Sequence, residues 1–65
     1  MLDPLTKERA LVIAAQLAAD LDVPMFVVRI GGSYAVASEN DLDTWWSRAL
    51  VTHEVMPDGH LTASD

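Results

Sequence analysis

An alanine-rich segment near the start of the chain restricts the possible folds more than any other feature of the sequence. Between Ala10 and Leu21, apolar residues recur at spacings of three and four, which predicts an amphipathic helix. Asp3 and Pro4 form a helix-start signal, because the carboxylate can cap free amides and proline tolerates the first helical position. The predicted helix is about 18 residues long. Its many alanines allow close packing, so we expect it to cover a β-sheet.

The apolar residues of this helix fall on two stripes. The broad stripe, which we expect to face the core, contains Ala10, Leu11, Ile13, Ala14, Leu17, Ala18 and Leu21. The thin stripe contains Leu5, Val12 and Ala19. We interpret the thin stripe as scattered surface residues, with a dimer seam as the alternative. Asp22, Val23 and Pro24 should end the helix, because the residue before a proline is pushed out of the α region.

Two strands joined by a glycine turn are predicted next. Met25–Ile30 is rich in β-branched and aromatic residues, and Gly31-Gly32 favours an antiparallel return through residues 33–37. The sequence therefore predicts a β-hairpin whose loop is either two or three residues long.

The two loop lengths give different strand registers. A two-residue loop pairs Val28 with Ala35, whereas a three-residue loop pairs Ile30 with Tyr34 and Val28 with Val36. We prefer the longer loop, because it gives one face a more continuous set of apolar residues. That face would contain Phe26, Val28, Ile30, Tyr34 and Val36.

The second half of the chain predicts a short helix and one or two further strands. Polar, cap-forming residues at 38–41 precede apolar residues at helical spacing, which favours a helix over roughly 41–48. Residues 50–56 alternate in the manner of a strand, and Pro-Asp-Gly at 57–59 is a turn sequence. Residues 60–62 can add a short edge strand, so the number of strands is three or four.

These elements predict a single α+β domain over residues 1–65. It would be a two-layer sandwich, in which the long N-terminal helix covers one face of an antiparallel sheet and the short second helix closes one end, in the order α-β-β-α-β-(β). A chain of 65 residues buries only about 60% of the surface that its unfolded form exposes. It has no cysteine, and therefore no disulfide. Marginal size without a crosslink favours self-association, so a homodimer is an expectation of the sequence.

The charge of the chain favours a protein partner over nucleic acid. Ten acidic residues against four basic ones give a net charge of -6, which repels phosphate backbones. We therefore expect no direct nucleic-acid binding and a basic protein partner, although a charge of this size is also ordinary for keeping a small domain in solution.

The sequence predicts neither a signal peptide nor a membrane span. Lys7 and Arg9 precede the apolar run 10–19 in the manner of a signal peptide, but Glu8 and Gln16 argue against that interpretation. No run approaches the roughly 18 apolar residues of a membrane span. We predict a cytoplasmic protein without membrane contact.

Catalytic, cofactor-binding and metal sites are not predicted. His53, Glu54 and His60 are metal-ligand types close together in the sequence, but their spacing fits no familiar zinc motif. A triad of Ser33, His53 and Asp41 lacks the local signature of a nucleophile. We therefore expect a protein that is not an enzyme and binds no cofactor.

The two adjacent tryptophans are the first interaction candidates. Trp45 and Trp46 point about 100° apart on a helix, so both cannot face the same core. An exposed indole would be an anchor for a partner or a second subunit. We expect Trp45 to be the exposed one, because Trp46 follows Leu42 by one helical turn.

Three further residues complete the interaction candidates: Tyr34, Asp41 and Asp43. With Glu39, the two aspartates form an acidic group that either caps the second helix or imitates nucleic-acid phosphates. We favour capping, because the remaining acids are scattered along the chain.

The leading functional hypothesis is a small, non-enzymatic protein–protein interaction module that acts as a homodimer or on another protein. Its binding surface would be the tryptophan region or an uncovered sheet face. The first alternative is an acidic inhibitor of a nucleic-acid-binding protein, encoded by a mobile element as a phage-type accessory protein. The second is a small hydrolase or metal-dependent enzyme.

Overall fold

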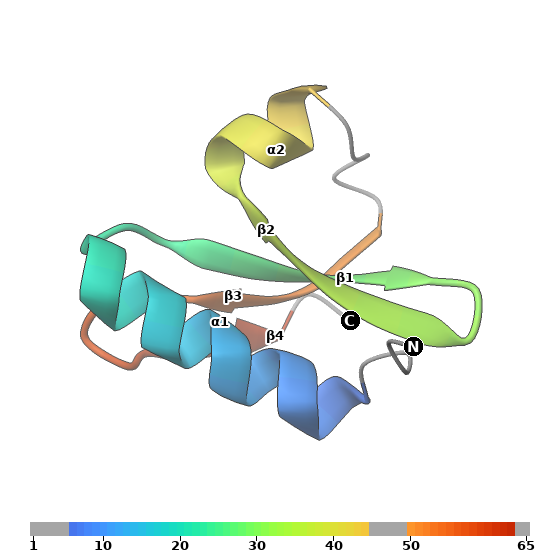
Figure 1. Cartoon of the computed structure of the whole chain (residues 1–65), viewed down its shortest axis with the longest axis horizontal. Coiled ribbons are helices and arrows are strands. Elements are labelled where there is room, and N and C mark those ends of the chain that lie inside the picture. The colour runs from blue at the N-terminus through green and yellow to red at the C-terminus, as the bar shows by residue number, and fades with distance from the viewer. Residues whose placement is uncertain (1–5, 45–49, 64–65) are drawn as a thin grey trace.

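The computed structural model describes residues 6–44 and 50–63 and shows an α+β fold in the element order α-β-β-α-β-β. A long N-terminal helix packs on a four-stranded antiparallel sheet, and a short second helix lies on the opposite side of the sheet (Figure 1). The predicted fold class and element order are confirmed, and the fourth strand is present. The second helix packs over a sheet face, whereas we expected it to close an end.

Helix α1, Lys7–Leu21, covers one face of the sheet, and its buried residues are all alanines. Ala10, Ala14 and Ala18 are fully buried, and Leu11 and Leu17 pack beside them at the rim of the core. Because an alanine side chain ends at Cβ, the helix axis can lie close to the strands. The other predicted core leucine, at position 21, is exposed, because at the last residue of α1 the chain turns away toward β1.

Both ends of α1 are fixed by local hydrogen bonds. The hydroxyl of Thr6 accepts a hydrogen bond of 3.2 Å from the Arg9 amide, and Thr6 has an extended backbone (φ −79°, ψ 164°). The helix therefore begins at Lys7, so the predicted start at residues 3 and 4 is wrong; those residues lie outside the described part of the chain. At the other end, Asp22 is left-handed and its amide donates to the Ala18 carbonyl. The predicted end of the helix is confirmed.

The sheet has the strand order β2-β1-β3-β4. Strand β1 is Met25–Ile30 and pairs with β2, Ser33–Ser38, on one side and with β3, Val51–Val55, on the other. Strand β4, Leu61–Ala63, pairs with β3 and forms one edge. Helix α1 packs against β1, β2 and β3.

The β1–β2 hairpin has a two-residue loop. Val28 pairs with Ala35 and Ile30 pairs with Ser33, so the preferred three-residue loop is wrong and the alternative register is correct. The cause is the turn geometry: φ is positive (59°) at Gly31 and not at the next residue, which is the pattern of a type II′ turn. Such turns match the twist of the flanking strands.

This register places apolar residues on both faces of the sheet. Met25, Val27 and Val55 pack with the α1 alanines, together with half-buried Tyr34 and Val36. The set predicted to share one face is thus split, with Tyr34 and Val36 on the side opposite to Phe26 and Val28. The second core contains Phe26, Val28, Ala37 and Leu42, with Ala35, Leu50 and Val51 at its rim.

Strand β1 is consequently buried on both faces. Val27 and Val28 are neighbours on opposite faces, and both have 0% exposure. Helix α2, Glu39–Thr44, contributes Leu42 to the second core. It begins before the predicted residue 41, because Ser38 caps it; predicted helix residues 45–48 lie outside the described chain. The uncovered sheet face that we expected as a binding surface does not exist over β1.

The β3–β4 turn forms as its sequence predicts. Gly59 has a φ of 92°, and Asp58 Oδ1 accepts a hydrogen bond of 2.8 Å from the His60 amide. The Met56 amide donates to the His60 carbonyl at 2.8 Å. The turn therefore delivers the chain directly into β4.

Candidate functional site

The structure separates the predicted interaction residues. Tyr34 is half-buried on β2 and packs against the α1 core. Asp41 and Asp43 lie together on α2, on the other side of the sheet. Trp45 and Trp46 lie outside the described residues. Tyr34 and the two aspartates therefore do not form one site.

Asp41 has the capping role that we favoured for it. Its Oδ2 accepts a hydrogen bond of 3.2 Å from the Ser38 amide, which lies at the start of α2. Asp41 is half-buried, whereas Asp43 is exposed. The carboxylate of Asp41 is thus engaged within the fold.

The described residues with metal-ligand and nucleophile chemistry lie apart. Among residues 6–44 and 50–63, no group of three or more His, Cys, Asp or Glu is placed to hold a metal ion. His53 pairs with Ala63, and its Nδ1 lies 2.9 Å from the Thr52 hydroxyl. Ser33 and Asp41 lie near opposite ends of β2, since Ser33 is its first residue and Asp41 belongs to α2, which follows its last. A triad of Ser33, His53 and Asp41 is not assembled.

A depression on the outer side of α1 offers one acid and one base but no catalytic pair. Its volume is about 430 Å³. The described lining residues are Thr6, Glu8, Arg9, Val12, Ile13 and Gln16. All of them belong to α1 or its cap, so the described lining brings no second element to the depression.

The sheet topology gathers acidic residues from distant parts of the sequence at one end of the molecule. Met25 pairs with both Ser38 and Val55, and Val55 pairs with Leu61. The start of β1, the end of β2 and the β3–β4 turn therefore meet there, beside the end of α1 (Figure 1). We call this region the acidic end; it contains Asp20, Asp22, Glu39, Asp41 and Asp58.

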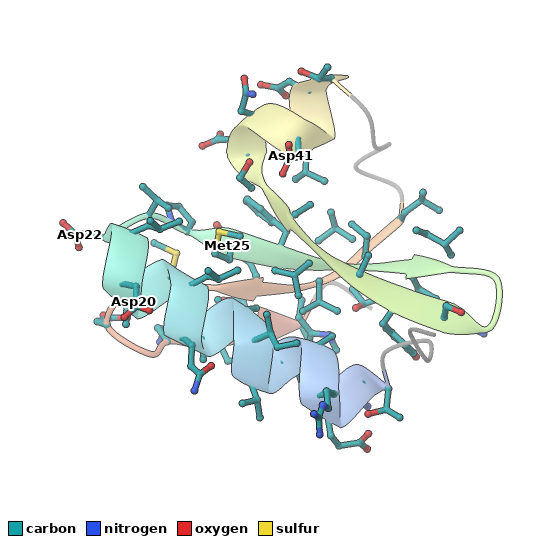
Figure 2. The ribbon with its side chains drawn as sticks, viewed as in Figure 1. Asp20, Asp22, Met25 and Asp41 are labelled. Atoms are coloured by element: carbon teal, nitrogen blue, oxygen red, sulfur yellow. The ribbon has the colours of Figure 1, made fainter. Side chains whose placement is uncertain are left out.

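Figure 2 shows Asp20 and Asp22 at the end of α1 and Asp41 on α2, which rises from the same region. All members of the acidic end except Asp41 are exposed. Asp20, Asp22 and Asp58, which are scattered along the chain, thus lie at the same end of the molecule, whereas Glu8 and Glu54 lie elsewhere. The sequence holds one signal for this arrangement: Asp22, Glu39 and Asp58 each flank a strand end that the hairpin pattern places at the same side.

The opposite end of the molecule carries the described basic residues. Lys7 and Arg9 lie at the start of α1, and Arg29 lies beside the β1–β2 turn, where its Nε donates to the Gly31 carbonyl at 3.4 Å. All three basic residues are exposed. We call Lys7, Arg9 and Arg29 the basic end. Glu8 lies between Lys7 and Arg9 in the first turn of α1 and is also exposed, so this end carries three described basic residues and one acid.

Two apolar side chains are exposed within the acidic end. Leu21 is 59% exposed and Val23 is 39% exposed, on either side of Asp22. No basic residue occupies the last turn of α1, although cations are favoured near the carbonyl end of a helix and anions are disfavoured. The acidic residues at this end of α1 are therefore unfavourable for the stability of the helix.

Comparison of the chain with protein-family models, with curated proteins and with solved structures finds no match. In the part of the chain that the structure describes, no helix has the length and apolar content needed to cross a membrane.

Proposed function

We propose that this protein is a non-enzymatic protein-interaction module whose acidic end docks on a basic, partly apolar surface of another protein. One observation carries the proposal: Leu21 and Val23 are exposed among acidic side chains, and no described basic residue lies among them. Exposed apolar residues bordered by charge are typical of protein-binding surfaces.

The two kinds of side chain would contribute differently to binding. Complete burial of a leucine or valine side chain stabilises by about 1.5–3 kcal/mol, so Leu21 and Val23 supply the apolar contact. Charge complementarity supplies mainly specificity. Asp20 and Asp22 also lie where a partner's cations would relieve their unfavourable interaction with the carbonyl end of α1.

The acidic end also favours a narrower candidate, in which the partner is a nucleic-acid-binding protein. Carboxylates collected on one surface can occupy a basic groove in place of phosphates. In that case duplex DNA and this protein compete for the same groove. The apolar pair would then contact the wall of the groove.

A defined probe tests the docking surface. The ¹⁵N-labelled protein is titrated with an amphipathic helical peptide of leucine and lysine, and with a matched peptide in which glutamate replaces lysine. We expect amide shifts at residues 20–23 with the lysine peptide only, weakening as salt is added. Shifts confined to the basic end, or equal binding of both peptides, would contradict the proposal.

A matched pair of variants locates the contact on α1. Leu21→Lys should weaken binding of the lysine peptide at least tenfold, because it removes an apolar contact and adds a like charge. Val12→Lys makes a similar change at a residue of almost equal exposure, 58%, outside the acidic end. It should bind as the wild type does; equal loss in both variants would argue against a local site.

The narrower candidate has its own test. Proteins that the wild type captures from host extract, and that Leu21→Lys does not capture, are challenged with duplex DNA. Release of the partner by DNA supports a shared basic groove. Retention in excess DNA contradicts the inhibitor hypothesis but leaves the docking surface to be judged by the peptide titration.

A further inference from the structure

Strand β4 is an edge strand, and no described strand pairs with its outer side. It pairs with β3 on one side, and its three residues, Leu61 to Ala63, are all exposed. Leu61 is 50% exposed. Proteins usually protect such an edge with charges, proline or a bulge, and Leu61, Thr62 and Ala63 provide neither charge nor proline.

The hydrogen bonds of the β3–β4 turn show which backbone groups point to the open edge. The Met56 amide donates to the His60 carbonyl, so these two residues form a hydrogen-bonded pair. Bonded and non-bonded pairs alternate along an antiparallel ladder. Thr62 is therefore bonded to Glu54, and the amides and carbonyls of Leu61 and Ala63 point away from β3.

We propose that β4 of one copy pairs antiparallel with β4 of a second copy, about a twofold axis at Thr62, so that two sheets become one. In this register Leu61 lies opposite Ala63 of the partner subunit. Both residues present outward backbone groups, so each such pair exchanges two hydrogen bonds. The twofold axis repeats the pair, and the interface closes on itself.

Charge complementarity identifies a second copy as the occupant. Strand β4 leads from the acidic end toward the basic end, because Leu61 pairs with Val55 and Ala63 with His53. Antiparallel pairing therefore sets the acidic end of each copy beside the basic end of the other. A parallel arrangement would bring the two acidic ends together.

Among the described residues, Glu54 of β3 is the acid beside β4, and it does not oppose the pairing. Glu54 pairs with Thr62, so the two copies of Glu54 would be separated by three strand spacings, about 14 Å. The two carboxylates therefore do not contact each other across the interface.

The pairing of the two β4 strands would also bury the exposed side chain of Leu61. Leu61 lies on the α1 side of the sheet, since it pairs with Val55 of the α1 core. Helix α1 packs against the other three strands. Leu61 from both copies would fill the strip between the two α1 helices.

Sedimentation velocity over a concentration series tests the dimer. The wild type should dissociate from dimer to monomer on dilution. Ala63→Pro removes an outward amide and leaves the Thr62 amide for β3, and proline is tolerated on an edge strand at such a position. We expect this variant to be monomeric wherever the wild type is dimeric.

Lysine substitutions provide the matched comparison. Leu61→Lys should weaken dimerisation at least tenfold, because it removes the apolar contact and places a charge at the new interface. Val12→Lys, at a residue of similar exposure (58%) outside both charged ends, should dimerise as the wild type does. Ala63→Pro should still bind the lysine peptide, so failure of the dimer and failure of the docking site are distinguishable.

Amide hydrogen exchange gives a readout that does not depend on any variant. Exchange at Leu61 and Ala63 should slow as protein concentration rises, whereas Thr62 should be protected at every concentration. A wild type that remains monomeric at all concentrations, or equal concentration dependence at all three amides, would overturn the inference. If Ala63→Pro does not fold, Leu61→Lys and the exchange data decide the question.

Discussion

Ser38 and Asp41 hydrogen-bond to each other reciprocally at the start of α2. The Ser38 amide donates to Asp41 Oδ2 and the Asp41 amide donates to Ser38 Oγ, both at 3.2 Å. This is a capping box in which aspartate replaces the usual glutamate or glutamine. The two hydrogen bonds fix the direction of α2 relative to the end of β2, and this direction places Leu42 in the second core.

Removal of either side chain of this box should destabilise the protein. We expect Asp41→Ala to lower the free energy of unfolding by about 1 kcal/mol, the ordinary value of a helix cap. Urea unfolding followed by circular dichroism measures this change. The double variant with Ser38→Ala should lose less than the two single losses combined, because the bonds are mutual. Strict additivity would show that the two residues act independently.

Asp22→Gly should stabilise the protein. Asp22 adopts a φ of 56°, a conformation that costs most L-residues roughly 1–2 kcal/mol and glycine almost nothing. We expect a gain of about 1 kcal/mol, which for a domain of this size raises Tm by roughly 4–8 °C. Asp22→Asn keeps a side chain without the charge and should lie between the two. A glycine variant no more stable than the asparagine variant would contradict this account.

The packing of α1 predicts opposite results at adjacent alanines. Ala14 is fully buried against the sheet, and Ala15 is exposed. Ala14→Leu should lower the free energy of unfolding by about 1–3 kcal/mol through overpacking, whereas Ala15→Leu should change it by less than about 0.5 kcal/mol. Chemical denaturation of both variants checks the difference. Equal tolerance at the two positions would mean that α1 is not held close to the strands.

Most of the fold could be predicted because its signals are local. Helical spacing from Ala10 onward, the end of α1 before Pro24 and the turn at 57–59 each depend on a few neighbouring residues. The hairpin register could not be predicted in this way. The preference for the longer loop assumed a single apolar face, whereas Val27 and Val28 are buried on opposite faces. The conformation of the turn at Gly31 decides the register.

The candidate site was harder to predict because it depends on strand order. Asp22, Glu39 and Asp58 are far apart in the sequence, and only the order β2-β1-β3-β4 brings their segments to one end. Capping of α2 by Asp41 is a local property, and that prediction is confirmed. The expectations for Trp45 and Trp46 remain predictions, since both residues lie outside the described chain.

The separation of acidic and basic ends makes the molecule an electric dipole as well as an anion. In the field of a charged body, a dipole rotates before any contact is made, so successive encounters begin in the same orientation. Steering of this kind accelerates association and is suppressed by dissolved ions. The strand order that sets the shape of the sheet thus also determines the direction from which this protein approaches a partner.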